Sequence, residues 1–287
     1  MLIVHDPRCA DYGSAQRPEQ PARITASVPF LKQAHPDWTW TEPTVVPSEA
    51  TLGLAHSPEH LKRLQVARDF DADTPYFPGI DEHARRGVAA ALTAMSAAVE
   101  KRQRAFSLMR PPGHHATQDQ AMGFCYLNQI AIAALEARRR YDLKRVAVWD
   151  FDAHHGNGTE EILEGRDGFL FASVHQYPGY PGTGTKSTKN CLNWPVAPHT
   201  PAATHRAVLQ ESWQRVRDFK PELVLVSAGF DAFAGDPITA MTLQISDFRF
   251  LGELLHEADF PVAAILEGGY SQELPELIEA FLKGWEG

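Results

Sequence analysis

Short apolar runs alternate with longer amphipathic or Ala-rich segments along most of this chain. Apolar runs bounded by turn residues predict buried strands, and the segments between them predict helices. The predicted strands span residues 2–5, 105–109, 146–150, 169–175, 192–196, 223–227 and 262–266. The predicted helices span residues 57–69, 82–104, 127–140, 159–163, 202–218, 246–257 and 274–285, and one more begins near Pro21 and kinks or ends near Pro29.

This alternation of strands and helices predicts an α/β protein with an open, mainly parallel sheet and helices on both faces. A chain of 287 residues is long enough for one large domain of this kind. The sequence contains no internal repeat, low-complexity tract or linker that would divide it. It therefore predicts a single domain over residues 1–287.

Acidic and imidazole side chains gather where the predicted strand 146–150 ends. Side chains at alternate positions of a strand face the same way, so Asp150, Asp152 and His154 are expected to converge on one point. One interpretation is a capped turn with solvated charges. Uncompensated carboxylates at the end of an apolar strand are costly to desolvate, however, and Zn²⁺ binds histidine nitrogen and carboxylate oxygen well. The pattern therefore favours a metal site.

Histidine and tyrosine side chains also follow predicted strands. His114 and His115 come after a rigid Pro-Pro-Gly turn, Tyr180 lies in a loop rich in proline and glycine, and Tyr270 follows the last strand. The carboxyl ends of parallel strands lie at one edge of the sheet, so these side chains can meet in one cleft.

Asp231 follows the strand 223–227 and suits a third metal ligand. Together with Asp152 and His154 it would leave coordination positions open for water and a substrate carbonyl. That arrangement is typical of a catalytic rather than a structural zinc site.

Composition narrows the function classes. A net charge of -9, from 27 basic and 36 acidic residues, argues against a nucleic-acid-binding surface. Three cysteines without CxxC spacing argue against a disulfide framework and for a reducing compartment. The N-terminal apolar run is too short for a secretory signal, and no uncharged apolar run approaches membrane-spanning length. We therefore expect a cytoplasmic protein without nucleic-acid or membrane partners.

Six motifs, in this order and spacing, resemble those of the zinc-dependent histone deacetylase family. They are Arg110-Pro-Pro-Gly-His-His-Ala, Gly123-Phe-Cys-Tyr-Leu-Asn, Asp150-Phe-Asp-Ala-His-His-Gly-Asn-Gly-Thr, Tyr180-Pro-Gly-Thr-Gly, Ser227-Ala-Gly-Phe-Asp and Glu267-Gly-Gly-Tyr. The resemblance spans essentially the whole chain. It implies the arginase-like open α/β fold and hydrolysis of an N-acyl amide on an amine such as the lysine ε-amine.

The resemblance implies a role for each catalytic residue. His114 and His115 resemble the paired general acid/base histidines, and Tyr270 resembles the tyrosine that polarises the carbonyl. Because one histidine must take a proton from water and hand one to the leaving amine, we assign that role to His115. His114, backed by the charge of Asp150, is its electrostatic partner. Asn157 stands where class I members carry Asp, so the class II-like bacterial deacetylases and amidohydrolases are the nearest group.

Two metal sites are also implied. The zinc ligands correspond to Asp152, His154 and Asp231, and Fe²⁺ is an alternative metal there. A structural potassium site corresponds to Asp150, Ser173 and Val174, with the backbone of Asp152 and His154.

The resemblance further implies a tunnel for the acyl-lysine stem. Its two aromatic walls correspond to Phe124 and Tyr180, and we group Gly123, Ile238 and Asp73 with them. Asp73 precedes Thr74-Pro75 near the expected rim and resembles a family Asp that contacts a peptide backbone. Arg23 resembles the arginine of an internal acetate channel.

Substrate choice depends on the residue directly after the Gly235-Asp236-Pro237 turn. Polyamine deacetylases of the family place a glutamate there, whereas this chain has Ile238. The second ammonium of a polyamine would lie unpaired at an apolar rim, at a cost of ~1–3 kcal/mol. We therefore expect an acylated lysine in a peptide or protein, or a small acylated amine of similar charge. Acetylpolyamines are the alternative, weakly favoured by the net charge of -9.

Two further function classes remain open. An arginase-like dimanganese hydrolase would need additional Asp and His at the strand ends, and the His114-His115 pair with Asn157 fits a single metal better. A non-catalytic acyl-lysine binding module would be expected to lose a ligand or the tyrosine, whereas all are present in this chain.

Overall fold

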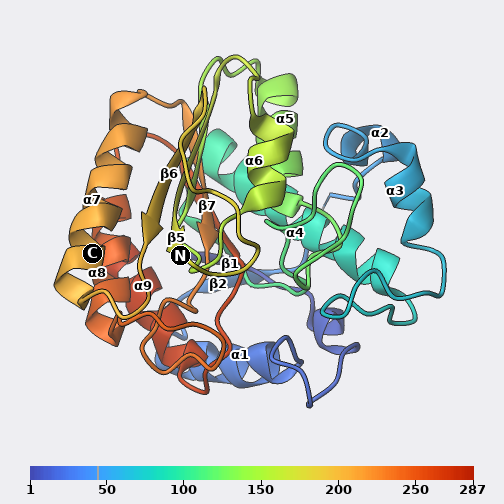
Figure 1. Cartoon of the computed structure of the whole chain (residues 1–287), viewed down its shortest axis with the longest axis horizontal. Coiled ribbons are helices and arrows are strands. Elements are labelled where there is room, and N and C mark those ends of the chain that lie inside the picture. The colour runs from blue at the N-terminus through green and yellow to red at the C-terminus, as the bar shows by residue number, and fades with distance from the viewer. Residues whose placement is uncertain (44) are drawn as a thin grey trace.

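One parallel sheet forms the centre of the computed structural model, which describes residues 1–43 and 45–287 (Figure 1). Its strands are β1 (Leu2–Val4), β2 (Thr39–Thr41), β3 (Ala105–Ser107), β4 (Val146–Asp150), β5 (Phe169–Gln176), β6 (Cys191–Val196), β7 (Leu223–Ala228) and β8 (Val262–Leu266). Within the described residues the sheet has eight strands in the order β2-β1-β3-β8-β7-β4-β5-β6, and every pair is parallel. The central strands β4, β7 and β8 are buried along their whole length, as expected for a sheet covered on both faces.

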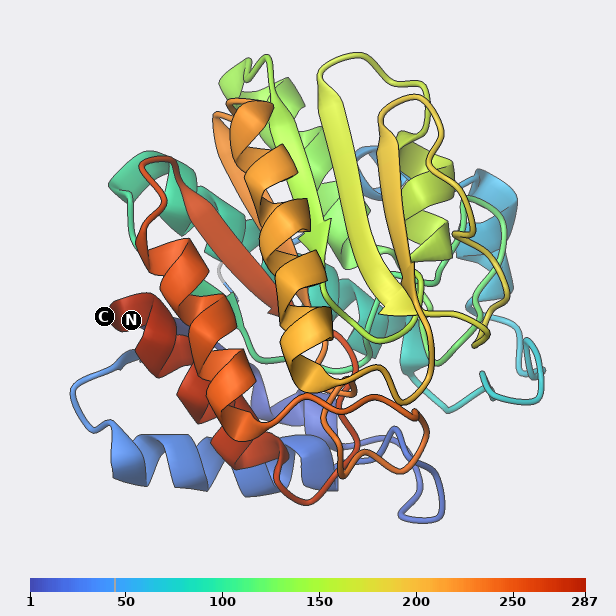
Figure 2. The same ribbon diagram turned by 60° about the vertical axis from the view of Figure 1, so that its left-hand side comes forward.

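Helices cover both faces of the sheet (Figure 2). They are α1 (Ala22–Ala34), α2 (Glu49–Leu52), α3 (Pro58–Arg63), α4 (Ile80–Lys101), α5 (Gln129–Tyr141), α6 (Asn157–Leu163), α7 (Ala202–Asp218), α8 (Ile245–His256) and α9 (Leu274–Glu286), with a short 3₁₀ helix at Pro7–Ala10. On one face α1 packs on α9, α9 on α8 and α8 on α7, while on the other face α4 packs on α5 and α5 on α6. The predicted fold class is confirmed.

Two glycines bring α8 and α9 close together. A Cβ at Gly252 would collide with the carbonyl oxygen of Phe281, and a Cβ at Gly284 would collide with that of Arg249. Glycine is poor inside an isolated helix, by about 1 kcal/mol relative to alanine. Its presence here is explained by the backbone contact that any side chain would prevent.

Several predicted boundaries were wrong. The helix expected over 57–69 ends at Arg63, and the helix that begins near Pro21 does not end near Pro29 but contains it and continues to Ala34. The edge strand β2 and the one-turn helix α2 were missed, because both are too short to show a hydrophobic period. Within residues 1–43 and 45–287, no helix combines the length and the hydrophobicity needed to cross a lipid bilayer.

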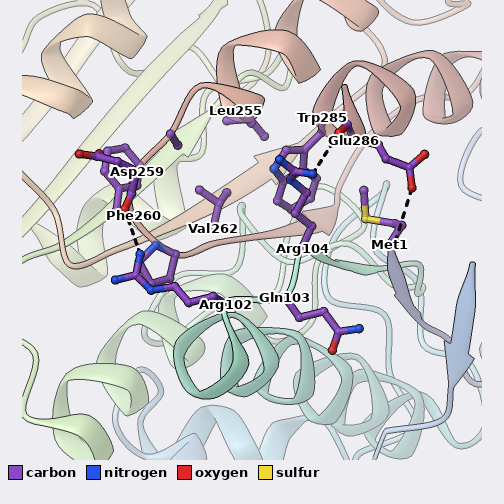
Figure 3. A pocket seen from close by; sticks show the side chains of 12 residues that line it. Met1, Arg102, Gln103, Arg104, Leu255, Asp259, Phe260, Val262, Trp285 and Glu286 are labelled. Atoms are coloured by element: carbon purple, nitrogen blue, oxygen red, sulfur yellow. Dashed lines mark hydrogen bonds and ion pairs between the residues drawn. The ribbon is translucent and has the colours of Figure 1, made fainter.

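The amino edge of the sheet contains a cleft of about 370 Å³ (Figure 3). Arg104 donates to the backbone carbonyl of Glu286 at the end of α9 (3.0 Å), and Arg102 donates to the carbonyl of Asp259 (2.9 Å). The N-terminal ammonium of Met1 lies 3.7 Å from the Glu286 carboxylate, which holds the two chain ends together. Arginine near a helix C-terminus satisfies carbonyls that lack an intrahelical partner. The charged residues of this cleft are therefore explained by their contacts within the fold, without a ligand.

Candidate active site

The loops that follow the strands meet at the opposite, carboxyl edge. The His114-His115 pair follows β3, Asp152 and His154 follow β4, and the Asp231 loop follows β7. These segments lie far apart in the sequence, but the sheet order places their strands close together. In Figure 2 the strand arrows point toward the side of the molecule where these loops gather.

Asp152, His154 and Asp231 form a cluster whose potential ligand atoms all lie within 4.8 Å of one another. His154 Nδ1 is 2.8 Å from Asp231 Oδ2 and 3.2 Å from Asp152 Oδ1. Burial alone would lower the pKa of His154, but the two carboxylates hold it well above its usual range. Two buried carboxylates therefore share a single imidazole, and the resulting excess of negative charge suits a divalent cation. Two oxygens and one nitrogen fit Zn²⁺ or Fe²⁺.

Backbone groups hold the two carboxylates in place. Asp152 accepts hydrogen bonds from the backbone N–H groups of Gly268 (2.7 Å) and His154 (2.8 Å), and Asp231 accepts one from Ala153 (2.8 Å). A Cβ on Gly268 would collide with both carboxylates. The glycine after Glu267 is thus required by the close approach of the chain to the metal cluster.

One sequence prediction about this cluster was wrong. Strand alternation was expected to bring Asp150 to the same point as Asp152 and His154, but β4 ends at Asp150 and the alternation ends with it. The Asp150 carboxylate instead accepts a hydrogen bond from His114 Nδ1–H at 3.0 Å. Its other oxygen accepts the backbone N–H of Asp152 at 3.1 Å, so Asp150 supports both the histidine pair and the loop after β4 without belonging to the three-residue cluster.

The two histidines differ in charge. Burial alone would lower the pKa of His114, but Asp152, Asp150 and Glu267 outweigh it and raise the pKa to about 10. For His115, burial and the neighbouring His114 keep the pKa well below 6.5.

The Asn157 amide fixes the proton on His115. Its Oδ1 accepts from His115 Nδ1–H at 2.8 Å, while its Nδ2 donates to the backbone oxygen of His115 and to the sulfur of Met122. Nε2 is then the basic atom of His115, whose pKa is lowered, beside a His114 whose pKa is raised. The opposite pKa shifts of His114 and His115 support His115 as the general base.

Glu267 anchors the histidine loop, a role that was not predicted from sequence. Its Oε2 accepts from the backbone N–H groups of Gly113 (2.6 Å) and His114 (3.1 Å), and the residue is completely buried. The available signal was an acid placed between the apolar strand β8 and two glycines. The contact joins residues about 150 positions apart, so local patterns could not reveal it.

Tyr270 is held from two sides. Asp236 Oδ2 accepts its backbone N–H at 2.8 Å, and the Arg23 guanidinium lies 4.9 Å from the centre of its ring. Arg23 also donates to the backbone carbonyls of Gly269 (2.7 Å) and Glu267. Burial raises the pKa of Tyr270 well above 10, so its hydroxyl keeps its proton and can donate. The role of Asp236 was missed by the sequence analysis.

A cavity of about 260 Å³ leads to the cluster. Its lining includes all the predicted tunnel residues, namely Phe124, Tyr180, Gly123, Ile238 and Asp73, and also His115, His154, Tyr270 and the unpredicted Arg17 and Pro18. The Phe124 ring packs edge-on against Tyr270 at 5.7 Å, and Tyr180 packs edge-on against His115 at 5.1 Å. A Cβ at Gly123, where φ is +55°, would strike the His115 ring. Glycine is therefore needed where the tunnel wall meets the base.

The predicted potassium ligands lie side by side. Asp150 pairs in register with Ser173, and the Ser173 hydroxyl donates to His175 Nδ1 at 2.8 Å because His175 Nε2–H donates to the Gly184 carbonyl. The oxygen lone pairs of Ser173 thus remain available. Asp150, Ser173 and Val174 are all buried, and the pairing of Asp150 with Ser173 brings a carboxylate and a hydroxyl group together, which are the oxygen donors that the potassium prediction needs.

The histone deacetylase domain model matches residues 17–284, which include the metal cluster, the histidine pair and Tyr270. The chain belongs to the histone deacetylase family. A probable deacetylase from Methanothermobacter thermautotrophicus is 33% identical over 306 residues, covering 100% of this chain and 91% of the relative. The histone deacetylase-like amidohydrolase of Pseudomonas aeruginosa is 36% identical over 246 residues, covering 78% and 64%.

The fold of this histone deacetylase family member is shared by a solved enzyme. The crystal structure of an acetylpolyamine aminohydrolase from Burkholderia pseudomallei superposes with a TM-score of 0.88 at 26% sequence identity, covering 100% of this chain and 99% of that one. The resemblance inferred from the six motifs is therefore confirmed at the level of family and fold.

Proposed function

We propose that the protein is a metal-dependent amidohydrolase that removes an acyl group, in the first place acetyl, from the ε-amine of lysine or a similar amine. The observation that carries this proposal is the cluster of Asp152, His154 and Asp231 at the base of a cavity that His115 and Tyr270 also line. Family membership supports the same reaction class.

Asp152, His154 and Asp231 would hold the metal, Zn²⁺ or Fe²⁺. When bound, such an ion lowers the pKa of a water molecule and polarises an amide carbonyl. Asp150, Ser173 and Val174, with the backbone of Asp152 and His154, would hold K⁺ and so stabilise the loop after β4.

The side chains of this protein perform the proton transfers. His115 Nε2 accepts the proton of the attacking water and returns a proton to the leaving amine, because His115 is neutral and its Nδ1–H is held by Asn157. His114, whose pKa is raised by the carboxylates of Asp152, Asp150 and Glu267, stabilises negative charge as it develops. Tyr270 donates its hydroxyl proton in a hydrogen bond to the carbonyl oxygen.

The cavity walls position the substrate. Phe124 and Tyr180 enclose the alkyl stem and exclude water, which strengthens the electrostatic interactions inside. The proposed acetate exit lies behind Arg23, where a smaller cavity of about 150 Å³ is lined by Arg23, Tyr270 and Ser271.

Ile238 favours acyl-lysine over acetylpolyamine as the substrate class. Its side chain is 37% exposed at the cavity rim, where it offers an apolar surface and no charge. An acetylpolyamine would need an anionic partner for its second ammonium at this point.

Metal titration tests the proposal. The purified protein is stripped with a strong chelator, then titrated separately with Zn²⁺ and Fe²⁺, and assayed on a blocked peptide containing acetyl-lysine. We expect no activity without metal and full activity at one equivalent per chain. Full activity of a metal-free preparation would overturn the assignment, and a requirement for two equivalents would favour the dinuclear, arginase-like alternative.

A further inference from the structure

Arg17 is a half-buried cation in the wall of the substrate cavity. Its Nη1 donates to the backbone carbonyl of Ala72 at 3.2 Å. No carboxylate within residues 1–43 and 45–287 forms an ion pair with Arg17 within 4.0 Å, whereas the nearby Arg23 and Arg110 both bind Glu19. The planar guanidinium of this cavity-lining residue therefore has further N–H donors that no carboxylate of the described residues occupies.

Asp73 stands on the same rim. The loop that carries it is fixed by Asp71, whose Oδ1 accepts the backbone N–H groups of Asp73 (2.9 Å) and Thr74 (2.6 Å). Thr74 Oγ1 in turn accepts the backbone N–H of Phe124 at 3.1 Å, which ties this loop to the tunnel wall. The Asp73 side chain is exposed and also lines the cavity. A cation and an anion thus flank one entrance.

We propose that this rim binds the α-carboxylate and α-ammonium of a free Nε-acyl-lysine, so that the preferred substrate is the acylated amino acid rather than a lysine inside a peptide. Arg17 binds the carboxylate, for which its fork of N–H donors is well suited, and Asp73 binds the ammonium. Free Nε-acyl-lysine has no net charge, so the overall charge of -9 does not repel it. This inference rests on the proposed deacylation.

The alternatives fit this rim less well. An internal peptide residue can offer its backbone N–H groups to Asp73, but it offers no carboxylate to Arg17. An acetylpolyamine could place its second ammonium on Asp73, but it has no carboxylate for Arg17 and brings a cation close to it. A peptide with acetyl-lysine at its C-terminus would satisfy Arg17 but not Asp73, so the two interactions can be separated by experiment.

Four substrates test the proposal on the metal-loaded protein. All are Nε-acetyl-lysine, with the α-carboxyl group either free or amidated and the α-amine either free or acetylated. We expect kcat/KM to be about tenfold higher for the free carboxylate than for the amide at a given α-amine. A free α-amine should likewise be favoured over an acetylated one. Because rim contacts persist unchanged through the reaction, both differences should appear mainly in KM.

Two variants assign each preference to its residue. Arg17→Gln should reduce the carboxylate-to-amide ratio to about one while keeping the preference for a free amine, and Asp73→Asn should do the reverse. Arg249→Gln, on the exposed face of α8, is the matched control and should keep both ratios.

Each outcome bears on a distinct claim. A wild-type preference for the doubly blocked substrate, or ratios that survive both rim variants, would overturn the rim proposal. Preference for the carboxylate without preference for the free amine would mean that the preferred substrate is a peptide with acetyl-lysine at its C-terminus, rather than the free amino acid. Absence of hydrolysis for all four substrates would instead contradict the proposed function.

Discussion

Charged side chains are buried at the carboxyl edge of the sheet, whereas at the amino edge they lie in an open cleft. At the carboxyl edge Asp150, Asp152, Asp231 and Glu267 are completely buried. At the amino edge Arg102 and Arg104 lie in an open cleft and bind backbone carbonyls, that of Asp259 in the turn after α8 and that of Glu286 at the end of α9. The amino-edge cleft is the larger hollow, at about 370 Å³ against about 260 Å³. Cavity size alone would therefore favour the amino edge, which is opposite the candidate active site.

The two edges differ in the energetic cost of burying their charged groups. Removing a carboxylate from water carries an effective penalty of several kcal/mol even after relaxation. A fold that keeps four such groups buried near one point therefore needs compensation there, from the histidines, from the proposed metal and from the raised pKa values of Asp150, Asp231 and Glu267, which favour their neutral forms. Arginines that cap exposed helix ends carry little desolvation penalty and need no ligand. Buried, incompletely neutralised charge thus distinguishes the candidate active site.

The largest expected effect follows removal of one metal-ligating charge. Asp231→Asn keeps an oxygen that can accept the Ala153 N–H, but it removes the anion. We expect bound metal to be lost and activity to fall to the level of the metal-free protein. The metal-free variant should be at least as stable as metal-free wild type, since a buried charge is gone. Elemental analysis, turnover and urea unfolding measure the three quantities.

Asp259→Asn is the matched control for this substitution. Asp259 is an exposed carboxylate at the amino-edge cleft, so its replacement should leave metal content and activity unchanged. Full metal occupancy and activity in Asp231→Asn would contradict the ligand assignment.

A smaller effect is expected at Tyr270. Tyr270→Phe keeps the ring between Phe124 and Arg23 and removes only the hydroxyl. Loss of one donor to a developing oxyanion lowers kcat by about 10²–10³-fold, with KM much less affected. Steady-state kinetics on an unactivated acetyl-lysine substrate measures this change. Tyr141→Phe on α5, far from the carboxyl edge, serves as control. An unchanged kcat in Tyr270→Phe would mean that another group stabilises the oxyanion.

A moderate change in selectivity is expected at the rim. Wild type should hydrolyse an acetyl-lysine peptide with higher kcat/KM than acetylputrescine, and Ile238→Glu should shift this ratio toward acetylputrescine by about tenfold. The glutamate adds an anion for the second ammonium at a point of the rim that is apolar in wild type. The ratio is measured at two salt concentrations, because the effect of an exposed charge weakens as salt rises. A wild-type advantage for acetylputrescine at both would show that another carboxylate controls entry.

Sequence patterns predicted the parts of this molecule that depend on local order. Strands β4, β7 and β8 were found because their apolar runs are uninterrupted and buried on both faces. The metal cluster was found because its three members come directly after two of those strands, β4 and β7. By contrast, β2 has the sequence Thr-Trp-Thr and is only partly buried, so neither hydrophobicity nor period distinguishes it from a loop.

The supporting residues of the site could not be predicted in the same way. Asp236 binds the backbone of Tyr270 across 34 positions, and Glu267 binds Gly113 across 154. Arg17 belongs to a polar segment with no strand directly before it, yet it lines the cavity. Such contacts arise only from the fold, and a carboxylate that binds a backbone N–H leaves no motif at the other end of the hydrogen bond. The family resemblance supplied the candidate catalytic residues but not these supports.

The smallest effect is expected at the amino edge and separates stability from activity. Arg104 donates to the Glu286 carbonyl at 3.0 Å and lies 3.1 Å from His256 Nδ1, so it joins the C-terminal ends of α8 and α9. Arg104→Gln removes a cation next to these helix ends and should lower the free energy of unfolding by about 0.5–1 kcal/mol. Because the cleft lies at the edge opposite the active site, kcat/KM should not change. Urea unfolding and steady-state kinetics on the same preparation test both statements. A several-fold change in kcat/KM at unchanged stability would show that the cleft influences catalysis, and that the contrast between the two edges is incomplete.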